Sequence, residues 1–420
     1  MCKLLFSAQS LLTRDAYLLF LTRFVRLFAY GSLSVVLVFY LVGLGLKESQ
    51  TGILLTLTLV GDTMISLYLT TRADRMGRRR MLIVGSILMA AAGLAFASTS
   101  NFVFLLIAGT IGVISPSGNE VGPFLSIEQA ALAHVVPDQS RTKVFAWYTL
   151  AGSAATATGA LVAGVITGAL QRKALPPVEA YRVVVILYAV LGVLLAGLFL
   201  RLSSATEVRS SRDALSLPTT LKRFLGIGQS HRVVVKLSGL FALDSFAGGF
   251  VVQSFAAYWF YLRFGVRPAA LGVIFFWANI FAGISALGAA RLAARWGLVN
   301  TMVLTHLPSN VLLILVPLMP NLSLAVAVLL LRFSISQMDV PTRQSYVMAV
   351  VRNDERSAAA AITGLARTTG AAITPLFVGY MFARSSWINV PFFLAGALKI
   401  LYDLLLYKEF VGVQPIEERQ

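Results

Sequence analysis

Long apolar blocks of roughly 20 residues dominate the sequence, and they decide which folds are open to it. Such a block crosses the hydrocarbon core of a bilayer as one α-helix, in which every backbone N–H and C=O pairs within the segment. The blocks are too long and too uniformly apolar for barrel strands, which alternate polar with apolar residues. The chain is therefore predicted to be an all-α integral membrane protein with twelve transmembrane helices, at 17–42, 51–70, 81–99, 102–133, 143–168, 181–202, 236–262, 269–290, 299–318, 322–346, 356–383 and 386–407.

The distribution of basic residues predicts the orientation of these helices. The net charge is +17, and most Lys and Arg residues fall on one set of alternate loops, such as Arg78–Arg80 and 201–236. Basic loops stay on the cytoplasmic side of a membrane, so both termini are predicted to be cytoplasmic. The positive charge then follows from topology, and we expect a lipid bilayer around the chain and no nucleic-acid partner.

An internal repeat indicates that one half of the chain was duplicated. Ala73–Gly77 (Ala-Asp-Arg-Met-Gly) has a second copy at Ala293–Gly297 (Ala-Ala-Arg-Trp-Gly), 220 residues later, and Gln129–Arg141 has one at Gln344–Arg356, 215 residues later. The second offset predicts that the helices at 143–168 and 356–383 stay in step. Parallel repeats imply two pseudo-symmetric six-helix bundles, at 1–202 and 236–420, joined by a cytoplasmic linker at 203–235.

The change of offset locates an irregularity in the block 102–133. From Asn101 to Gln129 is 28 positions, whereas the equivalent stretch from Asn321 to Gln344 is 23. The surplus falls near 115–123, where two prolines and two glycines predict a broken helix. Broken helix at membrane depth lines a water-filled cavity or is buried in protein. The alternative is that this segment lies near an aqueous face.

The stretch Asp74-Arg75-x-Gly77-Arg78-Arg79 resembles the signature of the major facilitator superfamily, and the twelve blocks and the repeat fit the same family. The resemblance implies that Asp74, Arg75, Gly77 and Arg78 form a latch with the start of the eleventh helix. Thr70 stands where the family usually has glycine. The pattern Gly159-Ala160-Leu-Val-Ala163-Gly164 is similar to the family's antiporter signature, although Ala160 replaces the usual proline.

The resemblance also implies that the first, fourth, seventh and tenth helices line a central cavity. Ionisable residues inside membrane helices are costly, so each is a functional candidate. The predicted substrate- and proton-binding residues are Arg23, Arg26, Asn119, Glu120, Asp244, Gln253, Arg332 and Asp339. Arg26 and Asp244 occupy equivalent repeat positions. Our hypothesis is that Asp244 or Glu120 takes up a proton in competition with substrate; the alternative is a permanent structural ion pair between Arg26 and Asp244.

Three further charge pairs are predicted. Asp62 and Arg367 are expected to pair across the seam between the halves. Glu128 and Arg343, beside the repeated glutamines, are expected to form a gate, and the alternative for both pairs is solvation at helix ends. Lys399 and Asp403 are four residues apart, so they share a helix face and are expected to neutralise each other.

Other chemistry has little support. Cys2 is the only cysteine, the three histidines lack metal-ligand spacing, and no Gly-rich loop ends in Gly-Lys, so we expect no metal, no cofactor and no enzymatic activity. The predicted function is secondary transport by alternating access, as a monomer in the cell membrane, with proton-coupled export of a small organic or amphiphilic compound. Proton-coupled uptake of a nutrient or organic anion is the alternative, and a non-transporting receptor or scaffold is a third.

Overall fold

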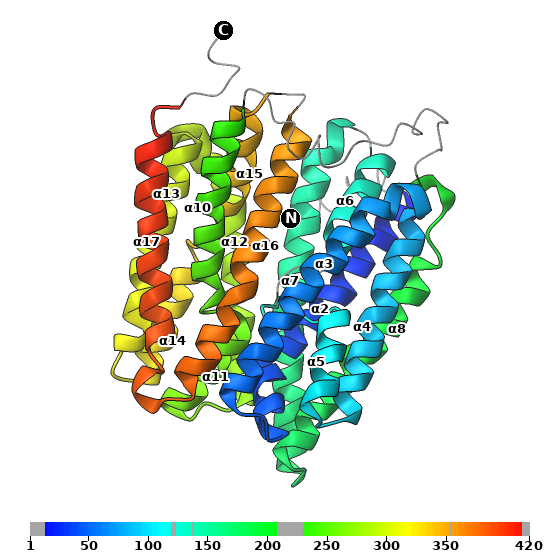
Figure 1. Ribbon diagram of the computed structural model, residues 1–420, viewed down its shortest axis with the longest axis vertical. Coiled ribbons are helices and arrows are strands. Elements are labelled where there is room, and N and C mark those ends of the chain that lie inside the picture. Colours follow the sequence, from blue (N-terminus) through cyan, green and yellow to red (C-terminus); the bar gives the residue numbers. More distant parts are fainter. Residues whose placement is uncertain (1–12, 119–122, 137, 208–229, 353–354, 414–420) are drawn as a thin grey trace, which may run out of the picture. The chain divides into compact units, whose positions relative to one another are not determined.

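The computed structural model describes residues 13–118, 123–136, 138–207, 230–352 and 355–413 (Figure 1). All regular secondary structure in these ranges is helical. The chain divides into two compact units. Unit 1 comprises Met1–Arg209 with Val266–Phe276, and unit 2 comprises Ser210–Gly265 with Trp277–Gln420.

Unit 1 is built around α2, which packs along α7 and α8. Its helices are α2 (Arg14–Gly43), α3 (Glu48–Met76), α4 (Arg78–Ser98), α5 (Phe102–Ile111), α6 (Phe124–Val135), α7 (Asp138–Arg172), α8 (Pro177–Phe199) and the 3-10 turn η1 (Ser204–Thr206). In α2, 89% of the most apolar window is buried, against 39–56% in the other spanning candidates, so α2 is the inner helix of this unit.

Unit 2 is built around α10, which packs along α16 and α17, while α13 packs on α15 and α17. Its helices are α10 (His231–Gly249), α11 (Gln253–Phe264), the part of α12 (Pro268–Trp296) from Trp277 on, α13 (Leu298–Leu315), η3 (Val316–Leu318), α14 (Leu322–Phe333), α15 (Asp339–Val350), α16 (Arg356–Phe382), η4 (Ser385–Trp387) and α17 (Val390–Phe410).

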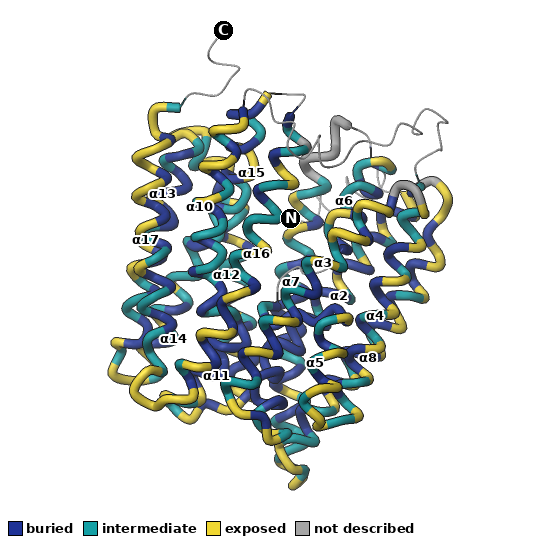
Figure 2. The backbone as a smooth tube through the Cα atoms, viewed as in Figure 1, coloured by how far each residue is buried: buried dark blue, intermediate teal, exposed yellow. Residues whose placement is uncertain are grey.

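The outer faces of these helices are apolar. Along α8 the exposed residues include Val190, Val193 and Leu194, with exposed fractions of 47–64% (Figure 2). Large apolar side chains exposed in such numbers require a lipid environment. The described residues contain nine helical stretches that are long and apolar enough to cross a membrane, and two shorter apolar helices, α5 and α14.

Three predicted blocks are each divided into two helices. The break predicted in the block 102–133 is confirmed, because α5 ends at Ile111 and α6 begins at Phe124. The blocks 236–262 and 322–346 were predicted to be continuous, and this was wrong. The first breaks after Gly248-Gly249, where two glycines favour the unfolded backbone. The second breaks at Ser334, because α14 ends at Phe333 and α15 begins at Asp339.

The repeat is visible in local backbone structure. Asn101 caps the start of α5 and Asn321, 220 residues later, caps the start of α14, each with its side-chain oxygen. Gly77 joins α3 to α4 with φ +100°, and Gly297 joins α12 to α13 with φ +80°. Both glycines adopt a left-handed conformation that disfavours any residue with a Cβ. The repeat read from Ala73–Gly77 is therefore confirmed in the structure.

Close helix packing corrects the register of the second half of the repeat. A Cβ on Gly31 would lie 2.2 Å from the carbonyl oxygen of Thr156, and a Cβ on Gly249 would lie 2.6 Å from the hydroxyl of Thr374. Both members of the second pair lie 218 positions after those of the first. The contact between α2 and α7 in unit 1 is thus repeated between α10 and α16 in unit 2.

The predicted offset of 215 for these helices was wrong, although it holds for the preceding pair. α6 begins at Phe124 and α15 at Asp339, which are 215 positions apart, whereas α7 begins at Asp138 and α16 at Arg356, which are 218 apart. The second half therefore gains three positions between α15 and α16. Gly164 is therefore not equivalent to Gly379, the residue that lies 215 positions after it.

We expect Gly370→Ala to destabilise unit 2, because its Cβ would lie 2.4 Å from the backbone oxygen of Ala242 on α10. Overpacking of this kind costs about 1–3 kcal/mol of unfolding free energy. The matched control is Gly364→Ala on the same helix, where a Cβ meets no atom within 4 Å. Thermal unfolding of the purified protein measures both. An equal fall in melting temperature for the two variants would contradict the close contact.

Candidate functional site

A buried ion pair joins α2 to α6 in unit 1. Nη2 of Arg26 donates to Oε2 of Glu128 at 2.8 Å, and both side chains are fully buried. The hydroxyl of Thr22 donates to Oε1 at 2.8 Å, and the hydroxyl of Tyr148 on α7 also donates to Oε2. The carboxylate thus receives a charge-assisted bond and two hydroxyl bonds, which offset the cost of burying it.

Arg23 lies one turn before Arg26 on α2 and is only 5% exposed. Its guanidinium lies 4.2 Å from the ring centroid of Tyr148, a cation–π distance. Gly152 on α7 makes room for it, because a Cβ there would lie 2.7 Å from Nε of Arg23. The structure therefore gathers Arg23, Arg26 and Glu128 around one tyrosine.

A larger network surrounds Asp244 on α10 in unit 2. Nη1 of Arg343 on α15 donates to Oδ2 at 2.8 Å, and Nζ of Lys399 on α17 donates to Oδ1 at 2.5 Å. Asp339, one turn before Arg343, lies 3.5 Å from the same Nη1. All four residues are buried, with exposed fractions of 4–7%. Asp244 is therefore clamped between two cations inside the bundle.

The network continues onto α13 through His306. Nδ1 of His306 lies 2.8 Å from Oδ1 of Asp403, and Nδ2 of Asn310 donates to Oδ2 of Asp403 at 2.8 Å. Nε2 of His306 lies 3.8 Å from Oδ1 of Asp244. The predicted pairing of Lys399 with Asp403 was wrong, because the two side chains bind Asp244 and His306 respectively.

Sequence reasoning missed His306, Asn310, Lys399 and Asp403 as members of this network. A signal was present, since His306 and Asn310 are one helical turn apart in an apolar block and therefore share a face, as Lys399 and Asp403 do. Two polar residues on one face of a membrane helix point toward protein.

The two ion pairs are equivalent in the repeat, with their charges exchanged. Arg26 and Asp244 are 218 positions apart on the inner helices α2 and α10, and Glu128 and Arg343 are 215 apart on α6 and α15. In unit 1 the basic residue is on the inner helix α2 and the acidic residue is on α6. In unit 2 the acidic residue is on the inner helix α10 and the basic residue is on α15. Each of the four side chains thus has an opposite charge within its own unit. The predicted pairs Arg26–Asp244 and Glu128–Arg343 join the two units and stay predictions.

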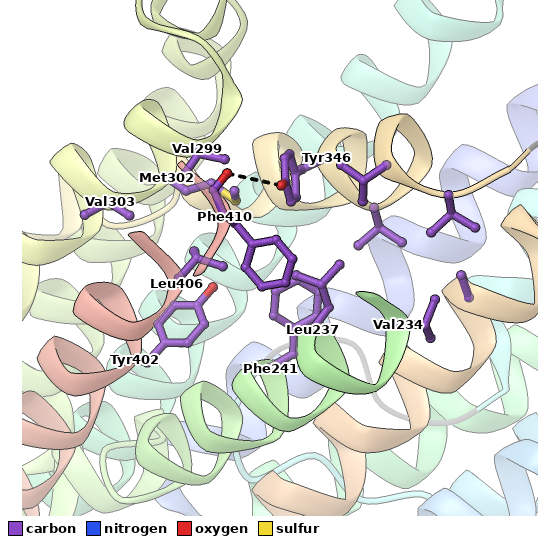
Figure 3. Close-up of a cluster of buried hydrophobic side chains, with 14 residues drawn as sticks. Val234, Leu237, Phe241, Val299, Met302, Val303, Tyr346, Tyr402, Leu406 and Phe410 are labelled. Atoms are coloured by element: carbon purple, nitrogen blue, oxygen red, sulfur yellow. Dashed lines mark hydrogen bonds between the residues drawn. The ribbon is translucent and has the colours of Figure 1, made fainter. Parts of the chain in front are cut away.

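An apolar cluster covers one end of the unit 2 network. Phe241, Met302, Tyr402 and Leu406 belong to it, and each is at most 2% exposed (Figure 3). The hydroxyl of Tyr346 reaches the carbonyl of Phe410 at 3.5 Å within this cluster. It lies toward the start of α10 and the end of α17, so it excludes water from the network on that side.

The remaining predicted residues of unit 2 lie near the network or beside it. Arg332 stacks its guanidinium 5.1 Å from the ring of Phe333 and acts on Asp244 and Asp339 through its charge. Gln253, at the start of α11, accepts a bond of 3.0 Å from Asn279 on α12. Arg367 on α16 is repelled by the like charge of Arg343 and attracted by the carboxylates of Asp244 and Asp339.

Two predictions in unit 1 lie beyond what the structure describes. Asn119 and Glu120 lie outside the described residues. Asp62 is a buried residue of α3, and its predicted partner Arg367 belongs to the other unit, so that pairing stays a prediction.

The predicted latch is described only in part. The side chains of Asp74 and Arg75 lie outside the described residues. Gly77 forms the tight turn, and the backbone N–H groups of Arg78 and Arg79 donate to the carboxylate of Glu207 at 2.7 and 3.1 Å. Sequence reasoning missed Glu207, which caps α4 from the segment after α8.

Two helical units, each with a buried ion pair inside apolar helices and related by an internal repeat, define a multi-pass membrane protein of the transporter class. The sequence profile of the Major Facilitator Superfamily matches residues 19–338, and the chain belongs to this superfamily.

Three similar proteins align over part or nearly all of this chain. An uncharacterized membrane protein of Saccharomyces cerevisiae, YJR124C, is 30% identical over 433 residues, covering 97% of this chain and 96% of the relative. The quinolone resistance protein NorA of Staphylococcus aureus is 26% identical over 136 residues, covering 32% of this chain and 34% of the relative. The crystal structure of a point mutant of the nucleoside transporter NupG superposes with a TM-score of 0.75 at 13% identity, covering 94% and 100% of the two chains, and so shares the fold.

Proposed function

We propose that this protein is a secondary active transporter that works by alternating access and exchanges protons for a small organic or amphiphilic compound in export. The observation that carries the proposal is Asp244, a buried carboxylate held by Arg343 and Lys399 beside an ionisable histidine. Ionisable residues inside a membrane mark ion and substrate pathways. The partial similarity to a quinolone resistance protein supports export of an organic compound.

The clamp around Asp244 supplies the physical basis for coupling. A carboxylate between two cations is stable only while its charge is matched. A proton, or a charged substrate that takes one of the cations, changes this match and so changes the relative energies of two conformations. Coupling needs this differential effect, because a ligand that binds both conformations equally shifts neither.

The basic residues in the loops indicate how the protein is oriented in the membrane. We propose a monomer in the plasma membrane with both termini in the cytoplasm, with the latch around Gly77 and Arg78 on that side and the segment 203–235 as the linker between the halves. Glu207 supports the placement of the latch, since it ties the turn at Gly77 to the segment that follows α8.

A transport assay in proteoliposomes tests the function. A fluorescent quinolone is added outside vesicles that contain a pH-sensitive dye and have an acidic lumen. We expect accumulation at least about fivefold above protein-free vesicles, with a lumen that turns more alkaline as drug enters, because an antiporter exchanges the two. Vesicles without a pH gradient and without protein are the controls. No drug-dependent proton flux for this probe or for a panel of amphiphilic compounds would contradict proton-coupled export.

Uptake by symport is the second candidate, favoured by the buried Arg23 and by Arg332, which suit an anionic substrate. The same assay separates the two. In symport an alkaline lumen drives entry, and entry makes the lumen more acidic. A receptor or scaffold that kept the fold without turnover gives binding without flux.

A further inference from the structure

We propose that His306 is the proton-accepting group of the unit 2 network: its Nε2 takes up the coupling proton, and the resulting imidazolium competes with Lys399 for Oδ1 of Asp244. The proposal rests on the proposed proton-coupled function and names the group that receives the proton. It moves that role away from Asp244, which sequence reasoning favoured.

Asp403 is the first step of the argument. It is fully buried, and in the described part of the chain the only ionisable group in direct contact with it is His306. Its other contact is the neutral amide of Asn310. A buried carboxylate without a counter-charge costs several kcal/mol, on the order of the loss caused by breaking a buried pair. A proton shared with His306 removes this cost.

The geometry assigns the two nitrogens of His306 to different tasks. Nδ1 and Oδ1 of Asp403 are 2.8 Å apart, so one proton lies between them. Nε2 is then the nitrogen that gains and loses the second proton of the ring, and it points to Asp244. The ring is steadied by Tyr402, whose ring lies edge-on at 5.8 Å. This arrangement fixes the tautomer, as a hydrogen bond to one ring nitrogen does in other histidine sites.

The added proton acts on the contacts of Asp244. Lys399 and Nε2 of His306 both approach Oδ1, at 2.5 and 3.8 Å, while Arg343 holds Oδ2. Adding a proton to Nε2 turns a neutral neighbour into a second cation at the same oxygen. Like charges repel at this distance, so the hold of Lys399 on Oδ1 weakens. Lys399 and Asp403 are one turn apart on α17. This helix is therefore affected both by the weaker bond of Lys399 to Asp244 and by the new positive charge beside Asp403.

The helices around this network supply its charged and titratable groups. α10 supplies Asp244, α14 supplies Arg332, α15 supplies Asp339 and Arg343, and α17 supplies Lys399, Tyr402 and Asp403. Arg332 and Arg367 act on Asp244 and Asp339 through their charges. Among these groups, His306 is the one that contacts Asp403 and can carry a positive charge.

The apolar cluster sets the direction of proton entry. Met302 and Leu406 lie about one turn from His306 and Asp403 on their helices, and both belong to this cluster (Figure 3). Water is excluded there, so the proton reaches Nε2 from the side of Asp244. In this step a proton leaves water and binds Nε2, and the network gains one positive charge.

Nitrogen-15 NMR of the full chain with labelled histidine tests the proposal without any substrate. His134 and His231 are exposed, so a variant with both changed to glutamine leaves His306 as the only histidine. We expect the Nε2 signal of His306 to change from that of the neutral ring to that of the imidazolium as the sample is acidified. In Asp403→Asn we expect the protonated fraction at pH 6 to fall at least about threefold, because the imidazolium loses its counter-ion. A His306 signal that does not change from pH 5 to 9 would overturn the proposal.

Proton flux in the quinolone proteoliposome assay gives the second readout. His306→Gln is expected to lower drug-driven proton flux at least about tenfold, while His134→Gln and His231→Gln leave it unchanged. Full flux in His306→Gln overturns the role of His306 and leaves proton coupling standing. If the wild-type protein shows no proton flux with any compound of the panel, the proposed function fails, and the coupling role of His306 fails with it even where the NMR titration is observed.

Discussion

Asp244→Asn is expected to abolish pH-driven transport and to lower the free energy of unfolding by about 3–5 kcal/mol, the cost of breaking a buried ion pair. The reason is that Arg343 and Lys399 share this one carboxylate, at 2.8 and 2.5 Å, so both lose their closest counter-charge at once. The asparagine side chain has nearly the same shape, so packing around it changes little. Proteoliposome flux and the thermal unfolding of purified protein measure the two effects.

The matched control for Asp244→Asn is Glu409→Gln. Glu409 pairs with Lys236, which is on the same helix as Asp244, but both side chains are exposed to solvent. We expect neither transport nor melting temperature to change, because solvent screens such a pair. If Asp244→Asn kept pH-driven transport, the charge at this position would have no part in coupling. If it kept the wild-type melting temperature, the clamp would not stabilise unit 2.

The second large effect is expected at the ion pair of unit 1. Glu128→Gln leaves Arg26 buried without its counter-charge, and Arg26→Gln does the same to Glu128, so each is expected to cost about 3–5 kcal/mol of unfolding free energy. Unit 2 carries the equivalent pair with its charges exchanged. The double variant Arg26→Glu with Glu128→Arg is therefore expected to recover at least half of the loss.

Thermal or denaturant unfolding of Arg26→Glu, of Glu128→Arg and of the double variant that combines them forms a double-mutant cycle. A coupling energy near zero would show that the charges do not stabilise one another. A double variant less stable than both single variants would show that the hydroxyls of Thr22 and Tyr148 fit only a carboxylate on α6. In either case unit 1 would differ from unit 2 in more than the order of its charges.

Much of the fold was predictable from the sequence because its signals are local. The apolar blocks and the paired glycines Gly77 and Gly297 each depend on a few neighbouring residues, and the structure confirms them. The break in the block 102–133 was predictable as well, since two prolines and a surplus of five positions lie in it.

The breaks after Gly249 and at Ser334 could not be predicted from the sequence in the same way. No proline lies between α10 and α11 or between α14 and α15, and glycine and serine are also common inside membrane helices. The three-position shift between α15 and α16 was missed because matching arginines, Arg141 and Arg356, suggested an alignment that the helix starts do not support.

The candidate site shows the limit of spacing arguments. Four-residue spacing correctly placed Lys399 and Asp403 on one face of α17, but it cannot say what the neighbouring helices bring to that face. Lys399 binds Asp244, which is 155 positions away in the sequence, and Asp403 binds His306, which is 97 positions away. The choice of partner is therefore a property of the tertiary packing.

The exchanged charges also constrain how the two halves diverged. A duplicated gene begins with identical halves, so the ancestral chain carried the same side chains at Arg26 and Asp244, and the same at Glu128 and Arg343. Reversing a pair takes two substitutions, and either one alone would put two like charges at contact distance inside the membrane. Descent by steps that avoid two like charges therefore passed through a half in which at least one of the two residues was uncharged. An uncharged polar residue at one of these positions in a living relative would be a survivor of that intermediate.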